Sequence, residues 1–148
     1  MQSMPIRIAI NGLGRIGRLA LRQVWDDPAF EFVAANSRSV AEIYAYLVKN
    51  DSMYGRWDKD VQESDNGHIM VEGKKIKIYN VADPVELPWK ELGIDVLIES
   101  TGVYSGKQDV AKHLAAGARK VLVSAPMSDP DATLVPNLNM DSYDPDKH

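Results

Sequence analysis

The sequence predicts an α/β fold built on a doubly wound, mostly parallel β-sheet. Two observations lead to this prediction. Short apolar segments with strand character alternate along the chain with segments whose apolar residues recur at helical spacing. In addition, 148 residues, of which 45% are hydrophobic, are enough for one globular domain with a substantial core.

The first part of the chain contains the opening strands and helices of this alternation. The expected elements are a strand at 5–11, a helix at 14–25, a strand at 30–36 and a helix at 40–48. The first strand is apolar enough to be buried on both faces, as a central parallel strand is. Ser39 is the expected N-cap of the second helix.

The middle of the chain, around residues 56–79, predicts a small antiparallel insert. Short alternating segments there are separated by Asp65-Asn66-Gly67 and by Glu72-Gly73, which are hairpin signals. The parallel pattern is then expected to resume. Its elements are a strand at 95–100, a helix at 107–116, a strand at 119–124 and one further strand at 132–136.

Three glycines follow the first strand at the spacing G-x-G-x-x-G and lead into the first helix. Gly12 permits the tight turn, Gly14 lets the backbone approach a pyrophosphate, and Gly17 lets the helix pack close to the strand. The N–H groups of the first helical turn then bind the anion. The motif predicts a Rossmann-type domain that binds a dinucleotide, with a purely structural turn as the alternative.

Composition excludes several other functions. The net charge of −4 gives no reason to expect a nucleic-acid partner, and the absence of cysteine excludes disulfides, cysteine-ligated metals and a thiolate nucleophile. No metal site is expected. No apolar run approaches the roughly 20 residues that span a bilayer, so no membrane contact is expected. Residues 1–4 show no features of a signal peptide, and we therefore expect a cytoplasmic protein.

The glycine motif and four later segments resemble one family. Residues 10–18 read I-N-G-L-G-R-I-G-R, which closely resembles the I-N-G-F-G-R-I-G-R of phosphorylating glyceraldehyde-3-phosphate dehydrogenases. The further matches, in chain order, are 49–52 with K-Y-D-S, 99–104 with E-S-T-G-V-F, 123–126 with I-S-A-P, and 135–144 with G-V-N…Y-D. The resemblance extends over essentially the whole chain, residues 1–148, and implies the NAD(P)-binding domain of such an enzyme.

The resemblance also implies which residues bind the cofactor. Asn11, Gly12, Arg15 and Ile16 would line the pyrophosphate cleft, together with Gly14 and Gly17. Ser100, Thr101 and Gly102 would lie near the adenosine ribose and phosphate, and Ser124 beside the nicotinamide riboside. The alternative for 100–102 is an ordinary turn at the end of a strand.

The chain departs from the family at the residue that selects between NAD and NADP. An acidic residue about 20 positions beyond the third glycine usually binds the ribose 2′-OH of NAD. Here the segment is Asn36-Ser37-Arg38-Ser39, whereas the NAD enzymes of the family read N-D. Serine and arginine side chains can bind a 2′-phosphate, so NADP or dual specificity is favoured over NAD alone. The alternative is that Arg38 points into solvent.

The second departure is that no residue is predicted to be catalytic. In the family a cysteine of an S-C-T-T-N segment attacks the aldehyde, and that segment would follow the equivalent of residues 147–148. We therefore expect that the catalytic domain is absent from this chain. The three histidines, His68, His113 and His148, are scattered and read as surface groups.

Three functions remain open. The favoured one is the cofactor-binding part of a glyceraldehyde-3-phosphate dehydrogenase that needs a catalytic domain or partner chain. The alternatives are a stand-alone NAD(P)-binding module or sensor and the cofactor part of an erythrose-4-phosphate-type dehydrogenase. An oligomer is expected, because a set of apolar residues could form an exposed interface: Leu134, Val135, Leu138, Met140 and Tyr143, together with the insert around Trp57. The tryptophans Trp25, Trp57 and Trp89 are predicted to be packing residues, with an interface as the alternative for Trp57.

Overall fold

The computed structural model describes residues 4–148, so the expectation for the start of the chain lies partly outside the described residues. The strands are β1 (Ile6–Asn11), β2 (Phe30–Asn36), β3 (Asn50–Asp51), β4 (Gly55–Arg56), β5 (Val61–Ser64), β6 (His68–Val71), β7 (Lys74–Tyr79), β8 (Val96–Glu99) and β9 (Lys120–Val123). The helices are α1 (Arg15–Val24), α2 (Ala41–Lys49) and α3 (Lys107–Ala115), with short 3₁₀ turns η1 (Pro84–Glu86) and η2 (Met140–Ser142).

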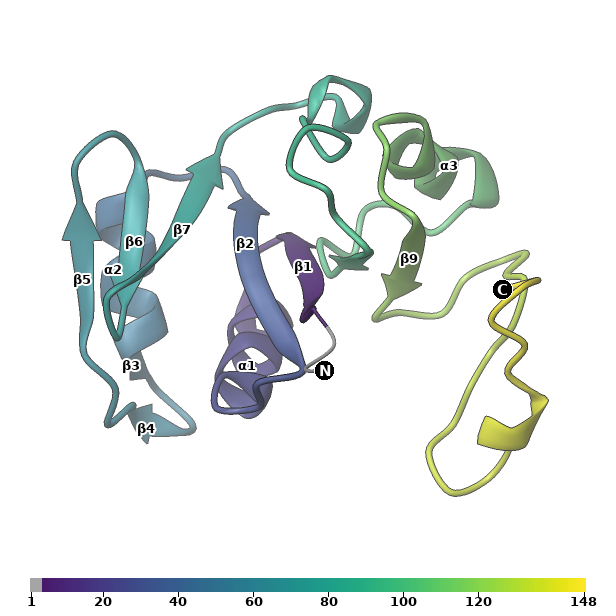
Figure 1. Cartoon of the computed structure of the whole chain (residues 1–148), viewed down its shortest axis with the longest axis horizontal. Coiled ribbons are helices and arrows are strands. Elements are labelled where there is room, and N and C mark those ends of the chain that lie inside the picture. Colours follow the sequence, from purple (N-terminus) through teal and green to yellow (C-terminus); the bar gives the residue numbers. More distant parts are fainter. Residues whose placement is uncertain (1–3) are drawn as a thin grey trace.

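The main sheet has seven strands in the order β5-β6-β7-β2-β1-β8-β9 (Figure 1). The five strands from β7 to β9 run parallel to their neighbours. From β1 the chain adds β2 and β7 on one side and then β8 and β9 on the other, so the strand order reverses between β1 and β8. This arrangement confirms the predicted doubly wound α/β class and places the topological switch point at the end of β1.

The predicted antiparallel insert is confirmed as hairpins but is part of the main sheet. β5 pairs with β6 and β6 with β7 in antiparallel fashion, while β7 also pairs with β2 in parallel fashion. A small separate sheet forms only between β3 and β4 among the described residues. The last strand of the insert, β7, is therefore also the third strand, in chain order, of the parallel part of the sheet.

The two faces of the sheet have separate cores because side chains alternate along β1. Ile8 and Ile10 point to the face covered by α1 and α2. Ala9, between them, points to the other face, where it belongs to a cluster with Leu97 and Trp89. The helix α3 lies on that second face (Figure 1), and the two layers hold β1 between them.

Two local predictions were wrong. Val40, not Ser39, is the N-cap residue of α2, and no side chain caps that helix end. The segment 132–136 is not a strand. Instead, Asn139 closes a loop over it: its Oδ1 accepts from the Val135 N–H at 2.7 Å, and its Nδ2 donates to the Thr133 carbonyl at 2.8 Å.

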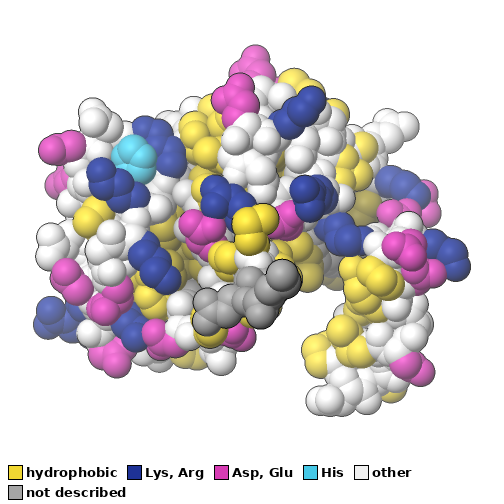
Figure 2. All heavy atoms as spheres, in the orientation of Figure 1, with side chains coloured by type: hydrophobic (Ala, Val, Ile, Leu, Met, Phe, Trp, Pro, Cys, Tyr) yellow, Lys and Arg dark blue, Asp and Glu magenta, His cyan; other side chains and the backbone are white. Residues whose placement is uncertain are grey.

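Residues 125–148 form a segment that we call the C-terminal arm. In Figures 1 and 2 the arm extends away from the sheet, and apolar side chains gather on it. Lys107 forms an ion pair with Asp131 at 2.8 Å, and Lys120 donates to the Pro145 carbonyl at 2.5 Å. The arm is therefore bonded to the domain near its start and near its end. The exposed large apolar residues of the arm are Val135, Leu138, Met140 and Tyr143.

Trp57 packs against the core, which agrees with its prediction as a packing residue and not with the alternative of an interface residue. Its ring is half-buried and packs edge-to-face on Trp25, with ring centroids 6.0 Å apart. The guanidinium of Arg22 lies over the Trp57 ring, 5.7 Å from the ring centre. Among residues 4–148, no helix has the length and apolar character needed to cross a bilayer.

Candidate functional site

The residues predicted to bind the cofactor meet at one edge of the sheet. They follow β1, β2, β8 and β9, which lie side by side and run parallel, so their carboxyl ends share an edge. Backbone hydrogen bonds join the consecutive strand ends: Gly12 N–H to Asn36 O at 2.8 Å, Ser100 N–H to Asn11 O at 2.8 Å, and Ser124 N–H to Glu99 O at 3.0 Å. The four predicted groups therefore form one continuous rim.

Two of the three motif glycines are required by the packing of the protein. A Cβ on Gly12 would lie 2.6 Å from the Thr101 nitrogen, and the residue has a φ of +94°. A Cβ on Gly17 would lie 2.4 Å from the Gly12 carbonyl oxygen. These residues let the loop after β1, the first turn of α1 and the loop after β8 approach one another closely.

Gly14 is different, because the protein itself does not require a glycine there. Its φ is −75°, and a Cβ would meet no atom within 4 Å. Gly14 is the N-cap of α1, and no side chain caps that helix end. The open space above this backbone is where a pyrophosphate would approach, so the residues present fit a dinucleotide.

The first turn of α1 is suited to an anion. It contains no acidic residue, and within the described chain no acceptor binds the N–H groups of Arg15, Ile16 and Gly17. The side chains of Arg15 and Ile16 are exposed. Free N–H groups and the helix dipole together favour a phosphate at this position.

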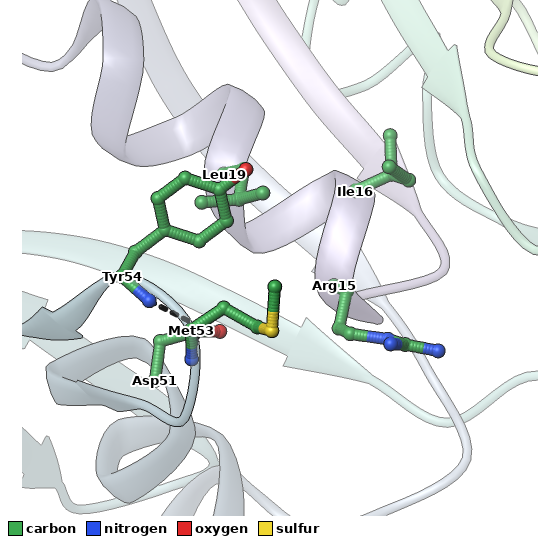
Figure 3. A pocket seen from close by; sticks show the side chains of 6 residues that line it. All are labelled: Arg15, Ile16, Leu19, Asp51, Met53 and Tyr54. Atoms are coloured by element: carbon green, nitrogen blue, oxygen red, sulfur yellow. Dashed lines mark hydrogen bonds between the residues drawn. The ribbon is translucent and has the colours of Figure 1, made fainter.

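A hollow of about 280 Å³ adjoins the same turn (Figure 3). It lies between α1 and the β3–β4 hairpin, and its lining residues are Arg15, Ile16, Leu19, Asp51, Met53 and Tyr54. Arg18 connects the two sides: it donates to the Leu13 carbonyl at 3.0 Å and lies 3.6 Å from the Asp51 carboxylate. The backbone N–H groups of Tyr54 and Met53 lower the pKa of Asp51, which keeps this carboxylate charged. Arg18 was not among the residues predicted to form the site.

Two predicted site residues, Ser37 and Arg38, directly follow β2, and their side chains differ in their contacts. The Ser37 hydroxyl accepts from the Leu13 N–H at 3.3 Å and is also bonded to the Tyr44 hydroxyl, so it supports the glycine loop. Arg38 is exposed and forms no hydrogen bond or ion pair with other described residues. The side chain of Asn36 is buried and bonded within the protein, as is that of Asn11, so these two can meet a ligand only through their backbone.

A buried polar network lies directly beneath the rim. His113 is 0% exposed and Glu99 is 2% exposed, so the expectation of a surface histidine was wrong. The His113 Nε2 atom lies 3.0 Å from Glu99 Oε2. Burial raises the pKa of Glu99, but hydrogen bonds from His113, Thr101 and Asn11 outweigh it and hold that pKa below its usual value. The signal in the sequence was a glutamate directly after the apolar strand residues Val96–Ile98.

The parallel sheet, the glycine loop at its switch point and the open helix end define a dinucleotide-binding α/β domain. Residues 6–107 match the family model described as "Glyceraldehyde 3-phosphate dehydrogenase, NAD binding domain". The chain belongs to this family.

Curated relatives agree with this assignment. The chain is 43% identical over 145 residues to the glyceraldehyde-3-phosphate dehydrogenase of Geobacillus stearothermophilus, covering 98% of this chain and 43% of that protein. It is 44% identical over 146 residues to that of Streptomyces coelicolor, with coverage of 98% and 43%. It is 44% identical over 144 residues to glyceraldehyde-3-phosphate dehydrogenase 1 of Nostoc sp., with coverage of 96% and 42%. The chain therefore spans about two fifths of the length of these relatives.

Proposed function

We propose that this chain is the cofactor-binding portion of a phosphorylating glyceraldehyde-3-phosphate dehydrogenase. A catalytic domain, in the same polypeptide or in a partner chain, would supply the nucleophilic cysteine, because the 148 residues contain none. The observation that carries the proposal is Gly14, whose glycine identity is explained by a ligand and not by the protein's packing. A bound nicotinamide would accept a hydride during oxidation of the aldehyde to an acyl phosphate.

In this proposal the chain's own residues bind and orient the dinucleotide. The N–H groups at the start of α1 hold the pyrophosphate, and the loop 100–102 lies against the adenosine side. Ser124 is exposed at the end of β9, next to the end of β8, in a position to contact the nicotinamide riboside. No residue of the chain is assigned a role in bond breaking.

We also propose that the site prefers NADP or accepts both cofactors. No carboxylate stands at position 37 to repel a 2′-phosphate, and the Arg38 guanidinium is exposed beside it. A hydrogen bond between charged groups contributes about 1.5–3 kcal/mol, which is roughly tenfold or more in affinity. Fluorescence titrations with NADPH and NADH test this: Arg38→Ala weakens NADPH binding roughly tenfold and leaves NADH unchanged. Arg56→Ala, an exposed arginine on β4, is the control.

The proposed specificity would be rejected if NADPH bound no more tightly than NADH and if Arg38→Ala changed the affinity for neither cofactor. That result would not contradict the proposal that the chain binds a dinucleotide. Tight binding of NADH alone would instead assign the site to NAD.

The proposed activity is tested by adding a separately expressed catalytic domain from a relative and measuring aldehyde oxidation in the presence of inorganic phosphate. Activity with glyceraldehyde 3-phosphate supports the proposal. Activity confined to erythrose 4-phosphate would identify the alternative dehydrogenase. Dinucleotide binding with no recovered activity towards either aldehyde would favour a stand-alone module.

The C-terminal arm is the proposed contact with a catalytic domain or a further copy of the chain. Leu138 is 76% exposed, and its neighbours Val135, Met140 and Tyr143 are exposed as well. Light scattering of the purified chain should show self-association, and a stable monomer at high concentration would contradict it. A cytoplasmic location is part of the same proposal, which cell fractionation tests.

A further inference from the structure

The carboxylate of Glu99 connects the two loops that form the rim of the dinucleotide site. Its Oε1 accepts from the Thr101 N–H at 2.8 Å and from the Thr101 hydroxyl. Its Oε2 accepts from the Asn11 side-chain amide at 2.6 Å. Asn11 immediately precedes the glycine loop, residues 12–17, and Thr101 lies in the β8 loop, residues 100–102. A single buried group therefore contacts both the β8 loop and the strand residue that leads into the glycine loop.

The third partner of this carboxylate comes from outside both loops. His113, on α3, places its Nε2 atom 3.0 Å from Glu99 Oε2. The other imidazole nitrogen, Nδ1, lies 3.1 Å from the indole Nε1 of Trp89. An indole N–H can only donate, so Nδ1 must accept and the single imidazole proton must lie on Nε2. This assignment makes His113 a neutral donor to Glu99.

The remaining contact agrees with this proton assignment. The side-chain nitrogen of Asn11 lies 3.3 Å from His113 Nε2, and both atoms carry hydrogen, so this is packing and not a hydrogen bond. The Asn11 amide is fixed instead by its donation to Glu99 and by the Asn36 amide, which donates to its oxygen at 2.8 Å. Every polar group around the carboxylate then has a partner.

The position of His113 distinguishes it from the other donors. Thr101 belongs to the β8 loop itself, so its bonds to Glu99 join that loop to the carboxylate but do not locate it, whereas Asn11 is the buried last residue of β1. His113 is held by the buried Trp89 on the second face of the sheet, and both side chains are 0% exposed. Together with Asn11 at the end of β1, His113 therefore holds the carboxylate from outside the β8 loop.

We propose that His113 is a positioning residue for dinucleotide binding: by donating from Nε2 to Glu99 it sets the β8 loop against the glycine loop. This inference goes beyond the proposed function, since it depends neither on the aldehyde nor on the choice between NAD and NADP. It also assigns the buried Trp89 a role, which is to hold the imidazole in the donating tautomer.

Two amide substitutions separate positioning from simple structural support. In His113→Gln the side-chain amide reaches the place of Nε2 and can still donate to Glu99. In His113→Asn the shorter side chain keeps an acceptor near Nδ1 for Trp89 but cannot reach the carboxylate. Both variants remove the imidazole from the same buried position, and thermal denaturation measures the loss of stability in each.

The readouts are the affinity for NADH and amide hydrogen exchange of the ligand-free, full 148-residue chain. His113→Asn is expected to weaken NADH binding roughly tenfold or more and to speed exchange at Thr101 by a similar factor. His113→Gln is expected to stay within about threefold of the wild type in both. Equal losses in the two variants that follow their stability would overturn the proposal, as would unchanged affinity and exchange in His113→Asn.

A variant on the loop side keeps the test decisive if His113→Asn does not fold. Thr101→Val retains the shape and the backbone N–H but removes the hydroxyl, which donates to Glu99 and accepts from the N–H of the exposed Val103 at 3.1 Å. Because Thr101 is only half-buried, the fold is retained, and NADH binding should weaken by about threefold to tenfold. Wild-type affinity in this variant would contradict the role of the carboxylate. Failure of the wild-type chain to bind NADH would count against the proposed function, while exchange at Thr101 would still decide this inference.

Discussion

Gly14→Ala should weaken dinucleotide binding without destabilising the domain. The backbone at Gly14 has φ −75° and ψ −162°, which alanine adopts freely, and the new Cβ meets no atom within 4 Å. Alanine is a poorer N-cap than glycine by about 1 kcal/mol or less. It also reduces the entropy of the unfolded chain, which stabilises by about 0.4–1 kcal/mol. These effects nearly cancel, so the melting temperature should change by less than about 3 °C.

The affinity responds differently because the methyl group occupies the space where the pyrophosphate approaches the backbone. Loss of one or two hydrogen bonds to a charged phosphate costs about 1.5–3 kcal/mol each, so NADH binding should weaken roughly tenfold or more. Gly106→Ala is the matched control, since Gly106 is also an uncapped glycine N-cap with extended backbone, but on α3. It should leave NADH affinity unchanged.

Gly12→Ala, in contrast to Gly14→Ala, should destabilise the domain. Its φ of +94° costs about 1–2 kcal/mol for alanine, and the clash with Thr101 costs about 1–3 kcal/mol more. The melting temperature should therefore fall by about 4–20 °C. Differential scanning calorimetry and NADH fluorescence titration measure the two effects. If Gly14→Ala bound NADH as tightly as the wild type, a close approach of the pyrophosphate at this position would be refuted.

Two further predictions concern the interior. Because hydrogen bonds depress the pKa of Glu99 in the folded protein, its contribution to stability is complete above the unfolded-state pKa of about 4.3 and is lost as the pH falls through the lower folded value. Glu99→Gln should lower stability at pH 7 and make acid unfolding below pH ~4.3 less steep, and an equally steep acid transition would contradict this. Trp57→Ala should cost about 2–4 kcal/mol through lost packing on Trp25, yet leave self-association unchanged. Denaturant titration and light scattering check the second prediction, and reduced self-association would show that Trp57 does belong to an interface.

Most of the fold could be predicted because its signals are local. The alternation of apolar segments located β1, β2, β8 and β9 to within one or two residues of their observed ends. Non-local pairing could not be predicted in the same way. The strand β7 joins β2 in parallel although the two are separated by α2 and four short strands, and nothing within β7 itself distinguishes this from a free hairpin.

The candidate site likewise has a local part, which could be predicted from the sequence, and a non-local part, which could not. The glycine spacing is a local motif, and it predicted both the turn at Gly12 and the open backbone at Gly14. The network beneath it joins residues that are 88 positions apart, as for Asn11 and Glu99, and 14 apart, as for Glu99 and His113. A histidine in an amphipathic helix carries no mark of the carboxylate that it will face, so its burial became evident only from the packing of α3.

The buried pair also explains why a charged residue occupies the end of a central strand. Taking a carboxylate out of water costs several kcal/mol, and apolar residues of similar size often give equal or greater stability. Stability alone therefore does not account for Glu99, although its hydrogen bonds offset the cost of burying its charge. What an apolar side chain could not provide is a set of directed bonds to Asn11, Thr101 and His113 at once. Since these bonds meet beneath the point where strand order reverses, the carboxylate is best understood as the part that fixes the shape of the site above it.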